Sequence, residues 1–132
     1  MHPLVRLTGT WLLVAVYASG IFVASSLSHP PMAATWDLPH LDKLYHTIAY
    51  SGLAFVLIRA LHLTCATRPI TPLFFSAAVM TIIYGACDEF HQAFIPERVM
   101  SLYDLLADAT GASVVASVWL NVQRRRPVLV KP

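Results

Sequence analysis

The stretch around which the chain is organised reads Tyr84-Gly-Ala-Cys-Asp-Glu-Phe-His-Gln-Ala-Phe-Ile-Pro-Glu-Arg98. It begins inside an apolar run and ends in a short proline-containing loop. At the junction it places two carboxylates, an imidazole and an amide, which belong to Asp88, Glu89, His91 and Gln92. Ionisable groups are costly within a membrane and are functional candidates there. The stretch therefore predicts a site at the end of a membrane helix and leaves its chemistry open.

The composition predicts a single membrane domain over residues 1–132. The chain is 57% apolar and only 12% charged, which is too apolar for an ordinary soluble domain. Its length leaves no room for a second domain. The two cysteines, Cys65 and Cys87, form neither a disulfide framework nor a C-x-x-C motif. The net charge of +2 is small, and the basic residues are not interleaved with aromatic ones, so we expect no nucleic-acid partner.

Four apolar runs predict four membrane helices, at about 7–27, 42–61, 73–92 and 101–121. The first run carries no charge and is long enough to cross a bilayer core of roughly 30 Å. Because it exceeds a typical signal-peptide core, we expect a retained helix. Asp42 and Ser101 are suitable N-cap residues for the second and fourth helices. Short connectors between apolar runs predict an all-α, antiparallel four-helix membrane bundle.

The basic residues predict the orientation of this bundle. Those that would face the cytoplasm are Arg6, Arg59, Arg68, Arg124, Arg125, Arg126 and Lys131. Those on the opposite side are Lys43 and Arg98. We therefore expect both termini to be cytoplasmic. All the acidic residues fall in or near the extracytoplasmic half, namely Asp37, Asp42, Asp88, Glu89, Glu97, Asp104 and Asp108. Acidic residues contribute little to topology, so their grouping indicates a site.

Helical spacing gathers the polar side chains onto three helix faces. Residues four apart lie on one face of a helix. The three sets are Asp42, His46 and Tyr50; Tyr84, Asp88 and His91; and Asp104, Asp108 and Gly111. Since all three faces are expected near the same membrane surface, they predict one polar pocket.

Three kinds of chemistry suit such a pocket. Two carboxylates and two histidines could hold a divalent cation that activates water or grips a phosphate. Without a metal, a carboxylate beside a histidine could act as a general acid and base. Lys43 and Arg98 could bind a lipid phosphate or another anionic head group.

A structural role is the alternative to a functional site. Asp88 or Glu89 could pair with Arg98, and Asp42 with Lys43, to hold the helix ends in register. Such networks are common, so this interpretation suits any single residue. It does not suit the whole cluster, because four short helices do not require five acids and two histidines in the membrane.

Three sequence motifs carry a resemblance to a known family. They read Asp42-Lys43-x-x-His46-x-x-x-Tyr50, Asp88-Glu89-x-His91-Gln92-x-Phe94-Ile95-Pro96-x-Arg98 and Ser101-x-x-Asp104-x-x-x-Asp108-x-x-Gly111. In this order and with this hydropathy, the chain resembles the VanZ-like family of small bacterial membrane proteins. The family often has Gly at position 97 and Asn at position 108, where this chain has Glu97 and Asp108. These extra carboxylates predict a more acidic pocket.

The resemblance implies a multi-pass protein of the bacterial cytoplasmic (inner) membrane. One member of the family is associated with resistance to the glycopeptide antibiotic teicoplanin. The resemblance therefore suggests work at the outer face, on the cell envelope or on lipids.

These observations lead to a functional hypothesis. The pocket is expected to bind, and could process, an anionic lipid or a lipid-linked cell-envelope intermediate. The expected catalytic set, which could also bind a divalent metal ion as cofactor, is Asp88, His91, His46 and Asp104. The expected substrate-binding residues are Lys43, Arg98, Tyr50 and Tyr84. The expected supporting residues are Asp42, Glu89, Gln92, Ser101 and Asp108. The alternatives are a non-enzymatic protein that binds or shields the envelope, with a structural polar cluster, and a proton-coupled transporter.

Overall fold

The computed structural model describes residues 3–28, 41–65 and 67–125. Four helices make up most of this part of the chain: α1 (Pro3–Ser25), α2 (Leu41–Thr64), α3 (Ile70–Gln92) and α4 (Leu102–Arg124). Each contains a stretch that is long and apolar enough to cross a membrane. The prediction of an all-α chain with four such helices is therefore confirmed.

The predicted starts of all four helices differ from the observed ones by one to four residues; the largest difference is at α1, which begins at Pro3 and not at about Leu7. α3 begins at Ile70, three residues before the predicted start at Leu73. Pro72 therefore lies within its first turn and does not precede the helix. A proline is tolerated there, since its missing N–H would have no partner inside the helix. α2 begins at Leu41, so Asp42 lies in the first turn and is not the N-cap. Its negative charge still favours that end of the helix.

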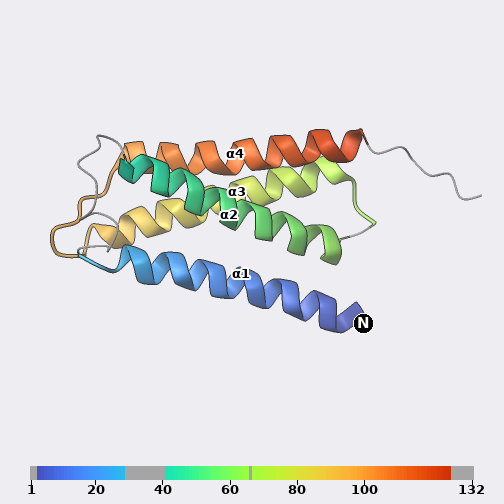
Figure 1. Ribbon diagram of the computed structural model, residues 1–132, viewed down its shortest axis with the longest axis horizontal. Coiled ribbons are helices and arrows are strands. Elements are labelled where there is room, and N and C mark those ends of the chain that lie inside the picture. Colours follow the sequence, from blue (N-terminus) through green and yellow to red (C-terminus); the bar gives the residue numbers. More distant parts are fainter. Residues whose placement is uncertain (1–2, 29–40, 66, 126–132) are drawn as a thin grey trace, which may run out of the picture.

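The helices lie side by side, with α1 and α4 on opposite sides of the molecule (Figure 1). α2 packs against all three of the others, and α4 contacts both α2 and α3. The core contains buried side chains of α2, α3 and α4, including Tyr50, Leu53, Leu57, Phe74 and Ala116. The central position of α2 lets polar residues of its first turns, such as Lys43 and His46, contact another helix.

A glycine on α4 allows α4 to approach α2 closely near the site. A Cβ atom at Gly111 of α4 would collide with the backbone carbonyl oxygen of Thr47 on α2. Close approach of backbones at a small residue is typical of membrane helix pairs. Gly111 therefore lets the two helices meet directly, one turn beyond Asp108.

α1 is attached to the other helices at separate points. Near its start, the indole N–H of Trp11 donates to the hydroxyl of Thr64, at 2.9 Å. Near its middle, the hydroxyl of Tyr84 donates to the carbonyl of Ala18, at 2.7 Å. Its C-terminal end is held by the bonds of Ser25 and Ser26 described below. About half of its large apolar side chains remain exposed at the surface, which suits contact with lipid; they are Leu12, Leu13, Val16, Phe22 and Val23.

The C-terminal ends of α1 and α3 meet the N-terminal ends of α2 and α4 at one end of the molecule (Figure 1). We call this the polar end; it comprises Ser25, Ser26, Asp42, Lys43, His46, Asp88, Glu89, His91, Asp104 and Asp108. Three residues that entered the predicted charge distribution, Asp37, Arg126 and Lys131, lie outside the described residues.

Candidate functional site

Asp88 is the point at which three helices join. Its Oδ1 accepts a hydrogen bond from the hydroxyl of Ser25 on α1, at 2.5 Å. Its Oδ2 accepts from the hydroxyl of Tyr50 on α2, at 3.1 Å, and from Nε2 of Gln92 on α3, at 3.2 Å. Asp88 is buried, and all three donors are uncharged. Such a shell supplies the hydrogen bonds that a buried carboxylate requires.

Ser25 was not among the residues predicted for the site. In the sequence it is one of two adjacent serines at the end of an apolar run, and such a pair suits many helix ends. Its only informative feature was that it is expected at the same membrane surface as Asp88. The structure gives both serines partners, since Ser26 Oγ lies 3.0 Å from His91 Nε2.

His91 faces α1 and not the middle of the bundle. Besides its contact with Ser26, its ring stacks on Phe22, with centroids 4.6 Å apart and planes inclined by 28°. The imidazole is therefore held by Phe22 of α1 and by Ser26, which directly follows α1. This is a different environment from that of the other histidine at the polar end.

His46 lies between two fully buried carboxylates. Its Nδ1 is 2.9 Å from Oδ1 of Asp108 on α4 and 3.9 Å from Oε1 of Glu89 on α3. The other oxygen of Glu89, Oε2, accepts the backbone N–H of Ser101 at 2.7 Å. In the described part of the structure, Oε1 of Glu89 and Oδ2 of Asp108 have no hydrogen-bond partner. We call these three residues the His46 cluster.

Lys43 lies at the edge of the polar end, between two carboxylates. Its Nζ is 2.5 Å from Oδ2 of Asp42 and 2.6 Å from Oδ1 of Asp104. Asp42 is well exposed, whereas only 12% of the Asp104 side chain is. The hydroxyl of Ser101 accepts the N–H of Asp104, which confirms Ser101 as the N-cap of α4. Asp104 is thus fixed at the helix start, while Asp42 is freer to move.

Arg98 and Tyr84, predicted to bind a substrate, both donate to the backbone of the first membrane segment. Nε of Arg98 donates to the carbonyl of Leu27 at 3.1 Å, and Tyr84 donates to Ala18. No ion pair joins Arg98 to Asp88 or Glu89, all of which are described. That predicted structural pairing is therefore not formed. The predicted pair of Asp42 with Lys43 is present.

Glu97 adopts an unusual backbone conformation in the loop after α3. Its φ of 65° lies in the left-handed region, which glycine enters without a steric penalty. Position 97 is also where the resembling family often has glycine. The shape of this loop therefore gives a physical reason for that preference.

The metal-binding set expected from the sequence is not gathered at one point. Asp88 is enclosed by its three donors, His91 is held by α1, and Asp104 is paired with Lys43. Among the described residues, the group whose ligand atoms lie within 4.8 Å of one another is the His46 cluster. Glu89 and Asp108, expected as supporting residues, thus occupy its centre. Adjacent residues on a helix point about 100° apart, so Asp88 and Glu89 face different neighbours.

A comparison with protein-family models decides the family. The VanZ/LLP1 model matches residues 5–123, which span all four helices. The chain belongs to the VanZ/LLP1 family. The predicted family is therefore confirmed, and the match extends beyond the motifs of α2, α3 and α4 to α1. The comparison with curated proteins found no match, and the comparison with solved structures found none.

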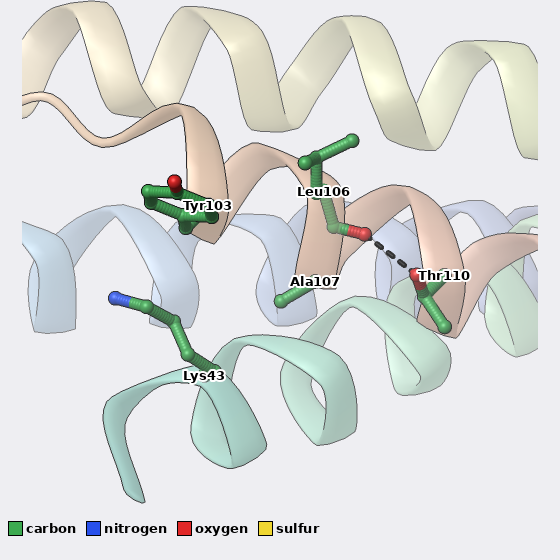
Figure 2. A pocket seen from close by; sticks show the side chains of 5 residues that line it. All are labelled: Lys43, Tyr103, Leu106, Ala107 and Thr110. Carbon is green, nitrogen blue, oxygen red and sulfur yellow. Dashed lines mark hydrogen bonds between the residues drawn. The ribbon is translucent and has the colours of Figure 1, made fainter. Parts of the chain in front are cut away.

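Family membership and the four apolar helices together support a multi-pass membrane protein. The VanZ/LLP1 protein also has a hollow on its surface, where α2 and α4 meet beside the polar end. Its volume is about 330 Å³, and it is lined by Lys43, Tyr103, Leu106, Ala107 and Thr110. Figure 2 shows the Lys43 side chain reaching from α2 towards the turn of α4 that carries Tyr103.

The lining of this surface hollow is mainly apolar. The hydroxyl of Thr110 is used within α4, where it donates to the carbonyl of Leu106 at 2.7 Å (Figure 2). Among the residues that line the hollow, Lys43 is the one with a charged side chain. A mainly apolar surface hollow with a cation on its wall suits the acyl chain and anionic head group of a lipid.

Proposed function

We propose that this VanZ/LLP1 protein binds the anionic head group of a membrane lipid, or of a lipid-linked cell-envelope intermediate, at its polar end. It would be an antiparallel bundle in the bacterial cytoplasmic membrane, with both termini in the cytoplasm. The polar end would then face the extracytoplasmic side. The excess of arginine at the opposite end supports this orientation.

The observation that carries the proposal is the hollow between α2 and α4 (Figure 2). Leu106, Ala107 and the methyl group of Thr110 can receive an acyl chain. Lys43 would meet the head group at the level of the first helical turn. Lysine near a membrane surface attracts anionic head groups.

Two carboxylates already contact Lys43, so an anionic ligand must replace one of them. Asp42 is the one that can leave, because exposed ion pairs contribute little free energy. Asp104 is less exposed and lies in the capped first turn of α4. A head-group phosphate would therefore take the place of Asp42 and leave the contact with Asp104 intact.

The test is lipid binding to purified protein in detergent, measured by native mass spectrometry with phosphatidylglycerol and phosphatidylcholine. We expect phosphatidylglycerol to be retained preferentially. Lys43→Met should weaken that preference about tenfold, because it removes a charge-assisted contact. Asp42→Asn should strengthen it, because it removes the competing carboxylate. An unchanged preference in Lys43→Met, or a loss in Asp42→Asn, would contradict the proposal.

The acyl-chain part of the proposal has its own control. Ala107→Trp should fill the hollow and reduce retention of both lipids. Val118→Trp places the same side chain further along α4, at a residue that is 58% exposed and does not line the hollow. It should bind lipid as the wild type does. Equal losses in both variants would show that bulk on α4, and not the hollow, decides binding.

A second candidate function is a purely structural polar end in a protein that binds or shields the envelope. The observation that favours it is the complete set of hydrogen bonds around Asp88. In that case the lipid preference would be absent in the wild type.

A further inference from the structure

We propose that His46, Glu89 and Asp108 bind one divalent transition-metal ion, with Zn²⁺ as the ion that best fits the ligands. The three residues come from α2, α3 and α4, so the ion would join the three helices. This site stands apart from the three donors around Asp88 and from the ion pairs of Lys43.

The first argument is the arrangement of the ligand atoms. One atom from each residue can be chosen so that all three lie within 4.8 Å of one another. Nδ1 of His46 is 2.9 Å from Asp108 Oδ1 and 3.9 Å from Glu89 Oε1. Zinc binds nitrogen and oxygen ligands at about 2.0–2.2 Å, so its ligands lie about 3–4 Å from one another. The separations of 2.9 and 3.9 Å are close to this range, and the third pair of ligand atoms is within 4.8 Å. The ion would replace the hydrogen bond that now joins His46 to Asp108.

The second argument is that two buried carboxylate oxygens lack partners. Glu89 and Asp108 are both fully buried, and Oε1 of Glu89 and Oδ2 of Asp108 accept no hydrogen bond among the described residues. An unsatisfied buried carboxylate oxygen is costly, whereas donors surround the neighbouring Asp88. Asp104 Oδ1 at the polar end also accepts no hydrogen bond from the described part of the chain, but the ammonium group of Lys43 lies 2.6 Å from it. Within the described structure, the two oxygens of the His46 cluster have no such cation beside them, and a metal ion would supply one.

The third argument is charge balance. Two carboxylates with a neutral imidazole carry two negative charges, and a divalent cation cancels both. The nearest lysine, Lys43, is already shared between Asp42 and Asp104. Arg98 is bonded to the carbonyl of Leu27. A metal ion is thus the cation that would make this buried cluster neutral within the membrane.

The ligand types select among ions. An imidazole suits zinc and the other transition metals, while Mg²⁺ and Ca²⁺ prefer oxygen ligands throughout. Three protein ligands leave a fourth position open, which is the pattern of zinc sites that bind water or a substrate. His46 keeps 15% of its side chain exposed while the acids are closed off, so the open position would lie on its side.

The open position connects the metal to the head group, and this connection rests on the proposed function. Lys43 and His46 are three residues apart on α2, which is about 5 Å along the helix. A phosphate held at Lys43 would therefore lie within reach of the fourth position. The metal would explain how an acid-rich pocket accepts an anionic ligand.

The test uses the full-length protein, stripped with a chelator and titrated with Zn²⁺ or Mg²⁺ in detergent. We expect elemental analysis to give one zinc per chain and zinc to raise the midpoint of thermal unfolding by several degrees. Mg²⁺ at equal concentration should have little effect. Co²⁺ in place of zinc should show the visible absorption of a four-coordinate site.

Three variants define the ligands. Asp108→Asn and Glu89→Gln should each lower zinc affinity at least tenfold, and His46→Gln should abolish stoichiometric binding. His91→Gln is the matched control, because His91 lies at the same end but contacts α1. It should bind zinc as the wild type does. Circular dichroism of the metal-free variants distinguishes loss of a ligand from loss of the fold. Asp108→Asn changes the size of the side chain least and is therefore the variant least expected to disturb folding.

Absence of stoichiometric zinc in the wild type would overturn the metal site. A loss of zinc binding in His91→Gln, together with normal zinc binding in Asp108→Asn, would also overturn it. Failure of the lipid proposal looks different. In that case Lys43→Met would leave an unchanged lipid preference, while the zinc stoichiometry and the cobalt spectrum persisted.

Discussion

At the scale of single residues, Asp88 shows how a carboxylate is accommodated among apolar helices. It accepts hydrogen bonds from a serine, a tyrosine and a glutamine on three different helices. Uncharged donors stabilise the carboxylate without requiring a second buried charge, which would itself be costly. Asp88 therefore serves as a structural junction.

Replacing this carboxylate should cost stability. In Asp88→Asn, one carboxylate oxygen is replaced by an NH2 group, so the hydroxyl of Ser25 or Tyr50 loses the acceptor to which it donates. We expect about 1–3 kcal/mol of destabilisation, the usual cost of an unsatisfied buried group. Thermal unfolding in detergent measures it. Asp42→Asn is the control, because its exposed ion pair should contribute less than about 1 kcal/mol. Equal losses in the two variants would contradict the role of Asp88 as the junction.

A second residue-scale prediction concerns the loop conformation at Glu97. Its φ of 65° is strained for any residue with a Cβ atom. Glu97→Gly should therefore be more stable than Glu97→Ala by about 1 kcal/mol, since both lose the carboxylate and only glycine lacks the Cβ. Equal melting temperatures would show that the loop changes conformation without cost.

How far the site could be predicted depends on the residue considered. The spacing predicted that polar faces of the second, third and fourth helices meet at one end. His46 does contact Asp108, and Tyr50 does contact Asp88. The adjacent residues Asp88 and Glu89 could not be separated, because their partners depend on how α3 is rotated about its axis. That rotation depends mainly on how α3 packs against α4 and α2. In addition, one partner of Asp88 is an ordinary serine at the end of α1.

At the scale of elements, the contact of α2 with α4 depends on Gly111. A methyl group there would meet the carbonyl oxygen of Thr47, which is backbone and cannot turn aside. The two helices would have to separate, and the contact between His46 and Asp108 would lengthen. The stability of this helix pair and the geometry of the candidate metal site are thus linked.

Gly111→Ala should therefore destabilise the protein by about 1–3 kcal/mol, the usual cost of overpacking a tight contact. It should also lower zinc affinity. Gly9→Ala on α1 is the matched control, because nothing lies within 4 Å of a Cβ at that position. That change should be neutral or slightly stabilising in a helix. Thermal unfolding and zinc titration of both variants check this prediction, and a stable Gly111→Ala protein with full zinc affinity would contradict it.

The four helices themselves were predictable from their apolar runs, because a membrane span leaves a strong signal in composition. Their ends were less so. Pro72 looked like a boundary, yet it lies inside the first turn of α3, where a proline loses no hydrogen bond. Such an error arises because a proline can either precede a helix or lie in its first turn.

At the scale of the whole molecule, the proposed orientation can be measured directly. We expect the polar end to face the cell exterior when the protein is made in a bacterial host. In a background with Cys65→Ser and Cys87→Ser, Val99→Cys places one thiol in the exposed loop at that end. Thr67→Cys places one in the α2–α3 connector, at the opposite end.

A membrane-impermeant maleimide added to intact cells should label Val99→Cys and leave Thr67→Cys unlabelled until the membrane is opened. This follows from the excess of basic residues at the end that carries Thr67. The reverse labelling would show that the termini lie outside. It would place the candidate metal and lipid sites on the cytoplasmic side.

The hydrogen bonds of Asp88 and Glu89 on α3 also bear on the order in which the helices assemble during synthesis. When α3 leaves the ribosome, Ser25 and Tyr50 have already been synthesised and can receive Asp88 at once. Glu89 must wait for the N–H of Ser101, which follows twelve residues later. One acidic residue thus finds its partners in completed helices, while its neighbour depends on the segment still to come. We therefore expect α3 to join α1 and α2 first, through Asp88, and α4 to complete the partners of Glu89 last.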